Sequence, residues 1–126
     1  MSDAKTILIV DDEPDVRTFL TSLLEDNGYS TVVAEDGTQC MQKVRESRPD
    51  LITLDITMPE QSGVRTYRDL KEDADLATIP VVIITAVGDP MHNFLKTRKQ
   101  VPEPEGFMSK PIDQDALLKM IADLLG

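Results

Sequence analysis

Cysteine is almost absent from this chain, and its shortage excludes two kinds of site. The 126 residues include a single cysteine, Cys40. One cysteine rules out an internal disulfide and offers no metal-binding cluster. Cys40 falls at an apolar position of an expected helix, so we predict that it fills the core.

Long hydrophobic runs are also missing. No segment approaches the length needed to span a bilayer, and the first five residues lack the apolar centre of a secretory signal. We therefore expect a cytoplasmic protein without membrane insertion. With 40% apolar residues, a chain of this length fits one domain over residues 1–126 with a single core.

Positive charge is scarce relative to negative charge. The chain has 13 Lys and Arg against 23 Asp and Glu, which gives a formal net charge of −10. Such a domain repels a phosphate backbone, so we expect no direct contact with nucleic acid. A cation, or a partner with a basic surface, is the more natural ligand.

Strand-like and helix-like segments alternate along the chain. Helical spacing of apolar residues follows each of five β-branched or apolar runs, and Asp113 is placed to cap the last helix. The fourth helix is expected within residues 91–99. This alternation predicts a parallel sheet with helices on both faces. The predicted strands are Thr6–Val10, Thr31–Ala34, Leu51–Asp55, Pro80–Thr85 and Phe107–Pro111.

Polar residues gather where the predicted strands end. Asp11 and Asp12 follow the first strand, Asp55 ends the third, Thr85 ends the fourth and Lys110 ends the fifth. Ligands of such sheets bind outside the carboxyl ends of the strands. Because an ionised carboxylate is costly in a core, we expect Asp55 at the exposed rim. Taken singly, these residues also suit turns, helix caps or solvated surface.

Three of these residues are acids that would repel one another in a small space. If the first and third strands are neighbours, Asp11, Asp12 and Asp55 lie together and raise one another's pKa. Mg²⁺ prefers such oxygen ligands and is the predicted cofactor. Asp55 can then act as a nucleophile toward a phosphoryl group, with Lys110 and the Thr85 hydroxyl stabilising its charge.

Four motifs together make the chain resemble the receiver domain of two-component response regulators. The resemblance covers nearly the whole chain and implies a flavodoxin-like, doubly wound (βα)5 fold with strand order 2-1-3-4-5. The motifs are Ile9-Val10-Asp11-Asp12-Glu13, Leu54-Asp55-Ile56-Thr57-Met58-Pro59, Ile84-Thr85-Ala86 and Ser109-Lys110-Pro111.

The resemblance implies a role for each residue at the acidic site. Asp55 would accept a phosphoryl group from a phosphohistidine of a sensor histidine kinase or histidine phosphotransfer protein. Asp11, Asp12, Asp55 and the backbone carbonyl of Thr57 would bind Mg²⁺. Such a protein is a phosphoacceptor with slow autodephosphorylation, and it is not a turnover enzyme.

The resemblance also implies a switch. Lys110 would bind a phosphoryl oxygen, and its peptide bond to Pro111 would be cis, as is usual in the family. On phosphorylation Thr85 would turn inward and Phe107 would become buried. The surface of the fourth helix, fifth strand and fifth helix would then shift toward binding a downstream output protein or domain.

One segment departs from the family pattern. Residues 100–106 carry two prolines and two glutamates, so we expect a short or mobile fourth helix.

Three other functions need consideration. A haloacid-dehalogenase-type enzyme would need an acid where Thr57 stands. A flavin or nucleotide carrier would need glycines in the first turn. The remaining alternative is a receiver-like adaptor that binds proteins without phosphorylation.

Overall fold

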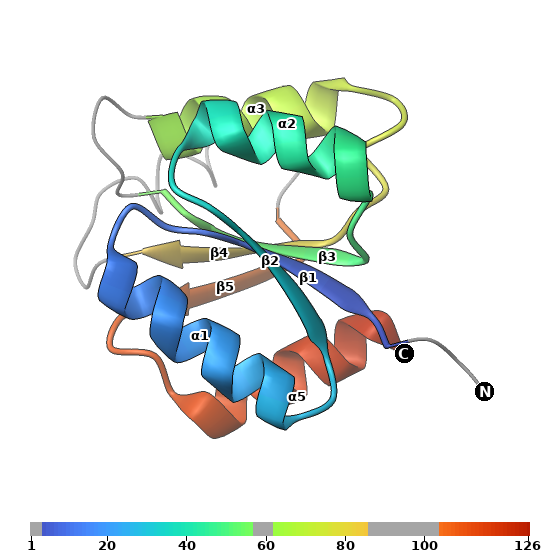
Figure 1. The fold of residues 1–126 in the computed structure, drawn as a ribbon. Coiled ribbons are helices and arrows are strands. Elements are labelled where there is room, and N and C mark those ends of the chain that lie inside the picture. Colours follow the sequence, from blue (N-terminus) through green and yellow to red (C-terminus); the bar gives the residue numbers. More distant parts are fainter. Residues whose placement is uncertain (1–3, 57–61, 86–103) are drawn as a thin grey trace.

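From the first strand to the fourth, strands and helices alternate as the sequence predicts (Figure 1). The computed structural model describes residues 4–56, 62–85 and 104–126, without the side chains of Ser62 and Thr85. The elements within these ranges are β1 (Thr6–Val10), α1 (Pro14–Asp26), β2 (Ser30–Ala34), α2 (Gly37–Ser47), β3 (Leu51–Asp55), α3 (Ser62–Glu72), β4 (Val81–Thr85), β5 (Gly106–Ser109) and α5 (Gln114–Leu125).

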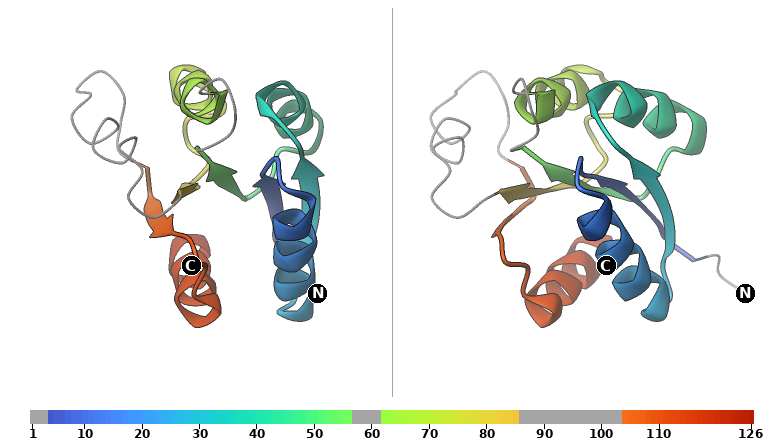
Figure 2. Two further views of the ribbon diagram at one scale, coloured as in Figure 1. Left: turned by 90° about the vertical axis from the view of Figure 1, so that its left-hand side faces the viewer. Right: turned by 60° about the vertical axis from the view of Figure 1, so that its left-hand side comes forward.

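The five strands form one parallel sheet in the order β2-β1-β3-β4-β5. Helices α2 and α3 cover one face, and α1 and α5 cover the other (Figure 2). This confirms the predicted flavodoxin-like, doubly wound architecture. The carboxyl ends of all five strands therefore meet at one edge of the sheet.

Alternation along the strands divides the core between the two faces. In β1, Leu8 and Val10 pack toward α2 and α3, whereas Ile7 and Ile9 pack toward α1 and α5. Successive side chains of a strand point to opposite faces, and both faces of this sheet are covered. All five residues of β3 are buried, including Asp55 at its end, and its three aliphatic residues predict a strand covered on both faces.

Several helix ends and one core position follow the predictions. The Asp113 carboxylate accepts a hydrogen bond of 3.0 Å from the Ala116 N–H and caps α5. Pro14 begins α1, where its missing N–H costs nothing. Cys40 is fully buried, and burial raises the pKa of its thiol to about 12. The thiol is therefore inert core filler.

Two predictions are wrong in detail. Helical spacing with Leu20 and Leu24 predicts Phe19 on the apolar stripe of α1, but it is 37% exposed. The polar sequence of residues 60–63 predicts a loop, but α3 begins at Ser62 and includes Gly63. The predicted fourth helix (91–99) and residues 100–103 lie outside the described residues. Within the described part, no helix has the length and apolar character of a membrane span.

Candidate functional site

The pairing of β1 with β3 places two buried acids side by side. Val10 pairs with Leu54 in the parallel register. Asp11 and Asp55, the residues that follow this pair, therefore lie side by side at the ends of adjacent strands. Each of these two residues is only 1% exposed. As expected, Asp55 lies at the carboxyl end of its strand, where a cationic group reaches it. The expected exposure is wrong, because a side chain that follows another strand compensates the charge in place of water.

That side chain is Lys110, which directly follows β5. Its Nζ lies 3.2 Å from Asp55 Oδ2, 3.4 Å from Asp11 Oδ2 and 3.0 Å from Glu13 Oε1. Its side chain is 20% exposed, so one partly buried ammonium is shared by three carboxylates. The Lys110–Pro111 peptide bond is cis.

The crowding changes the pKa of two members of the site. Burial, together with the charge of Asp55, raises the pKa of Asp11 from 3.8 to about 6, although the Glu13 N–H and Lys110 oppose the change. Burial alone would lower the pKa of Lys110. Its hydrogen bond to Glu13 and the charges of Asp55 and Asp11 outweigh burial and raise that pKa above the usual value.

The acids also fit a divalent cation. One carboxylate oxygen from each of Asp11, Asp12, Glu13 and Asp55 lies within 4.8 Å of the others. Asp11 Oδ2 is buried; Lys110 Nζ lies 3.4 Å from it, and it has no hydrogen-bond partner among the described residues. A buried carboxylate oxygen without a hydrogen bond is stabilised by a further cation, and Mg²⁺ takes oxygen ligands. Thr57, the fourth predicted ligand, lies outside the described residues.

Hydrogen bonds from three sides fix the turn that carries Asp11. Arg17 Nη1 donates to the Asp11 carbonyl at 2.8 Å, and the Glu13 N–H donates to Asp11 Oδ1 at 2.9 Å. The Asp11 N–H donates to the Ala34 carbonyl at 3.2 Å. Sequence reasoning assigned no role to Glu13 or Arg17. Glu13 directly follows the acid pair, which was a usable signal, whereas the spacing of Arg17 gave none.

The two predicted switch residues lie in the neighbouring strands β4 and β5. Thr85 is the last residue of β4, and its side chain lies outside the described part of the structure. Phe107 lies in β5, is half-buried and packs against the core beneath α2 and α3. Thr85 pairs with Ser109, so the backbone places Thr85 beside the residue that precedes Lys110.

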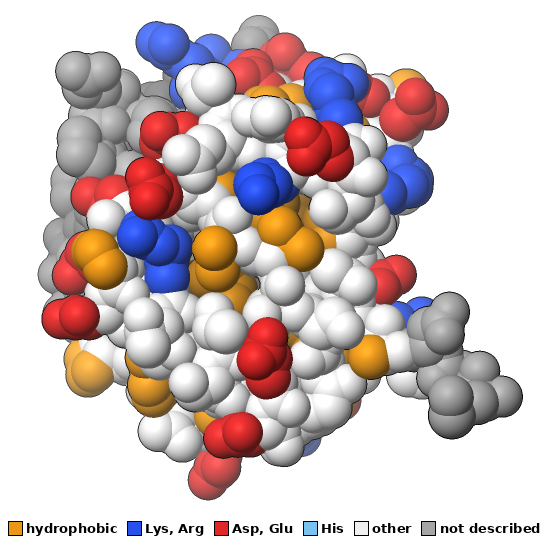
Figure 3. Space-filling model, viewed as in Figure 1, with side chains coloured by type: hydrophobic (Ala, Val, Ile, Leu, Met, Phe, Trp, Pro, Cys, Tyr) orange, Lys and Arg blue, Asp and Glu red, His pale blue; other side chains and the backbone are white. Residues whose placement is uncertain are grey.

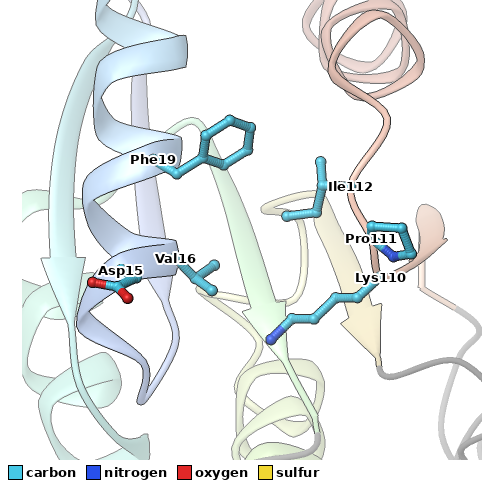
Figure 4. A pocket seen from close by; sticks show the side chains of 6 residues that line it. All are labelled: Asp15, Val16, Phe19, Lys110, Pro111 and Ile112. Atoms are coloured by element: carbon cyan, nitrogen blue, oxygen red, sulfur yellow. The ribbon is translucent and has the colours of Figure 1, made fainter.

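An apolar groove opens beside the acidic site. It has a volume of about 340 Å³ and is lined by Asp15, Val16, Phe19, Lys110, Pro111 and Ile112. Figure 4 shows Val16 and Phe19 of α1 facing Pro111 and Ile112, with the Lys110 side chain extended between them. Lys110 therefore belongs both to this groove and to the site around Asp55.

The surface around the site is acidic. On the face drawn in Figure 3, Asp and Glu side chains gather toward the side to which β4 and β5 point in Figure 1, with Lys and Arg interspersed. Hydrophobic atoms appear there only as small separate patches. Fold and site together define a parallel α/β domain with a cluster of acids at the carboxyl ends of its strands.

Comparison with known proteins specifies this class. The sequence profile of the response regulator receiver domain matches residues 7–122. The chain belongs to this family. Receiver domains are signalling domains that interact with kinases and output proteins, and they are not typical turnover enzymes.

Individual relatives agree with the family. Protein PilH of Pseudomonas aeruginosa is 34% identical over 94% of this chain and 96% of its own length. The polar-differentiation response regulator DivK of Brucella anthropi is 34% identical over 97% of each chain. The signal receiver domain of a signal transduction histidine kinase from Syntrophus aciditrophicus superposes with a TM-score of 0.84 at 34% identity, covering 97% of this chain and 90% of that one.

Proposed function

We propose that this chain is the phosphoacceptor of a two-component phosphorelay and that Asp55 carries the phosphoryl group. One observation carries the proposal: a buried carboxylate at the end of the central strand lies 3.2 Å from a lysine ammonium and beside a second buried acid. An aspartate with only a structural role at the surface does not need to be buried beside a lysine, whereas an aspartyl nucleophile needs a cation beside it.

Three residues of this chain have separate roles in phosphoryl transfer. An oxygen of Asp55 attacks the phosphorus of a partner phosphohistidine. A P–O bond forms as the P–N bond breaks, and the leaving imidazole takes up a proton. The Lys110 ammonium neutralises charge on the transferred oxygens, and the Thr85 hydroxyl donates a hydrogen bond to one of them. The product is a phosphorylated protein, so no turnover is required.

Mg²⁺ completes the proposed site. Asp11, Asp12, Asp55 and the backbone carbonyl of Thr57 would hold it. When bound, the ion supplies positive charge that stabilises the transferring phosphoryl group. The Oδ2 of Asp11 supports this assignment, because it is buried without a hydrogen bond and its carboxylate belongs to the cluster of four acids.

The proposed partners act on two different surfaces. A sensor histidine kinase or histidine phosphotransfer protein, in the cytoplasm, would seat a helix in the groove beside Phe19. The groove is continuous with the phosphoacceptor site through Lys110. Phosphorylation would then move Thr85 and Phe107 and change the surface around β5 and α5 that an output protein or domain binds.

Intact-mass measurement after incubation with acetyl phosphate tests the proposal. The wild-type chain with Mg²⁺ should gain one phosphoryl group, and chelation of the metal should abolish the gain. Asp55→Asn should gain none, because its amide is a poor nucleophile. Asp26→Asn, which changes an exposed acid of α1, should behave like the wild type. An adduct that persists in Asp55→Asn would refute the assignment.

The alternative is an adaptor that binds its partner without phosphorylation. The same variants separate the two functions. A phosphoacceptor should bind its output partner more tightly after phosphorylation and lose that gain in Asp55→Asn. An adaptor should bind equally well in all three proteins.

A further inference from the structure

An ion pair between a buried lysine and a partly exposed glutamate lies at the start of β5, at the opposite end of the strand from Lys110. Lys71, in the last turn of α3, has a side chain that is only 2% exposed. Its Nζ donates to the carbonyls of Ala77 at 3.2 Å and Ile79 at 3.4 Å, and to the two carboxylate oxygens of Glu105 at 2.9 and 3.0 Å. These partners occupy all three N–H groups of the ammonium.

The carboxylate of Glu105 joins three elements. Its Oε1 also accepts a hydrogen bond of 2.7 Å from the N–H of Val81, the first residue of β4. Glu105 directly precedes β5, so one side chain connects the end of α3, the start of β4 and the start of β5. In effect, the carboxylate supplies the acceptor that one more residue of β5 would otherwise offer to β4.

Strand β5 is a four-residue edge strand whose described ladder runs from Val82↔Gly106 to Thr85↔Ser109. Phe107 and Met108 of this strand are only partly buried against the two sides of the core. As an edge strand it is hydrogen-bonded to β4 alone, so contacts at its start add to a short ladder. A second close contact lies at the same end, because a Cβ added to Gly106 would come within 2.6 Å of Met120 Sδ. The start of β5 is thus held from β4, α3 and α5.

We propose that Lys71 and Glu105 are positioning residues for Lys110: they fix the register of β5 and so hold the Lys110 ammonium within reach of Asp55. A slip of one residue moves a strand by about 3.3 Å and turns its side chains to the other face. That displacement equals the whole Nζ-to-Oδ2 separation of 3.2 Å between Lys110 and Asp55. The catalytic part of this inference rests on the proposed function.

Amide hydrogen exchange tests the register role without any phosphorylation. Glu105→Ala and Lys71→Met should accelerate exchange of the β5 amides by about tenfold or more relative to those of β1. Glu105→Ala leaves the buried Lys71 ammonium without its carboxylate, and Lys71→Met removes the link between α3 and the start of β5. Glu105→Gln keeps an acceptor for the Val81 N–H and should have a smaller effect in the same direction. It also serves if Glu105→Ala does not fold.

A matched control is available at the same end of α3. Arg45→Met breaks the 3.3 Å pair between Arg45 and Asp73, a pair that does not involve β5, and should leave β5 exchange unchanged. Equal acceleration in β1 and β5 would mean that Lys71 and Glu105 only stabilise the whole fold, and the inference would be overturned.

Phosphorylation by acetyl phosphate tests the action through Lys110. Glu105→Ala should lower the rate constant at high donor concentration by about tenfold and leave the half-saturating concentration unchanged. In a Lys110→Ala background it should cause no further loss, since the residue it positions is gone. The same fold-loss in both backgrounds would refute positioning. If the wild type takes no phosphoryl group, the proposed function fails, and hydrogen exchange still decides the register role.

Discussion

At the scale of single residues, Asp11 is the member of the acidic site whose ionised carboxylate is disfavoured by burial. Its carboxylate is buried, adjoins Asp55 and has one oxygen without a hydrogen bond among the described residues. The pKa of this group is therefore raised from 3.8 to about 6. Without a metal, the folded state favours the protonated acid, and this preference ties stability to pH.

The sign of that dependence can be stated for Asp11→Asn. Because the pKa is higher in the fold than in the unfolded chain, the contribution of Asp11 is complete below about pH 4 and is lost as the pH rises through about 6. With metal chelated, the variant should exceed the wild type in stability by up to about 3 kcal/mol at pH 7 and by little at pH 4.

Urea unfolding at both pH values measures this difference. Asp26→Asn controls for the loss of one negative charge. Because Asp26 is exposed, the effect of this substitution on the free energy of unfolding should contain no contribution from a buried carboxylate. A difference between Asp11→Asn and wild type that is the same at pH 4 and pH 7 would contradict the raised pKa.

Thr53 is a second buried residue with a polar atom that lacks a hydrogen bond among the described residues. It lies in the middle of β3, is 1% exposed, and its hydroxyl has no hydrogen-bond partner within the described ranges. Thr53→Val removes a buried polar atom and keeps the shape, so it should raise the free energy of unfolding by about 1 kcal/mol. Thr31→Val, which removes a 2.7 Å bond to Glu25, should give no gain. A less stable Thr53→Val protein would show that the hydroxyl is satisfied.

At the scale of elements, the approach of α3 to the end of β3 depends on Gly63. A Cβ at this position would lie 2.6 Å from the Asp55 carbonyl oxygen and still closer to the Cα of Ile56. Gly63→Ala must therefore displace α3 or the end of β3 and should destabilise the protein by about 1–3 kcal/mol, despite the better helix propensity of alanine.

Thermal or urea unfolding tests this, with Arg65→Ala on the exposed side of α3 as the control. The control should change stability by less than about 0.5 kcal/mol. A neutral Gly63→Ala variant would mean that the helix can move away at no cost.

Most elements could be predicted because their signals are local. The apolar runs gave Thr6–Val10 and Leu51–Asp55 with the bounds that the structure has, and proline and glycine positions gave the ends of α1. Strand β5 was predicted one residue late, at Phe107, because glycine carries no strand preference. The start of this strand is set by Glu105, whose partner Lys71 is distant in sequence.

At the scale of the whole molecule, the groove beside the acidic site should matter only for a protein donor. Phe19 is exposed there and lines the groove with Lys110. Phe19→Ala should slow phosphoryl transfer from a phosphohistidine protein by about tenfold, since aromatic anchors often carry a large share of binding energy. Phosphorylation by acetyl phosphate should be unchanged.

A comparison of the two donors provides its own control. If Phe19→Ala slowed both donors equally, the groove would affect the chemistry at Asp55 rather than docking. If neither donor were slowed, the partner would bind elsewhere.

The site could be predicted only in part, because some of its contacts join residues that are distant in the sequence. Asp11, Asp12, Asp55 and Lys110 follow from strand ends that any parallel sheet brings to one edge. The burial of Asp55 and the link between Lys110 and Glu13 depend on distances across the fold that no local pattern contains. The same holds for the pair of Lys71 and Glu105, because the charge of Lys71 predicts a surface position and not a buried ammonium.

Diffraction from crystals grown with magnesium and beryllium fluoride tests the central claim most directly. We expect Mg²⁺ bound by Asp11, Asp12, Asp55 and the Thr57 carbonyl, with the fluoride group on Asp55 and in contact with Lys110. An empty site, with these acids turned into solvent, would contradict it.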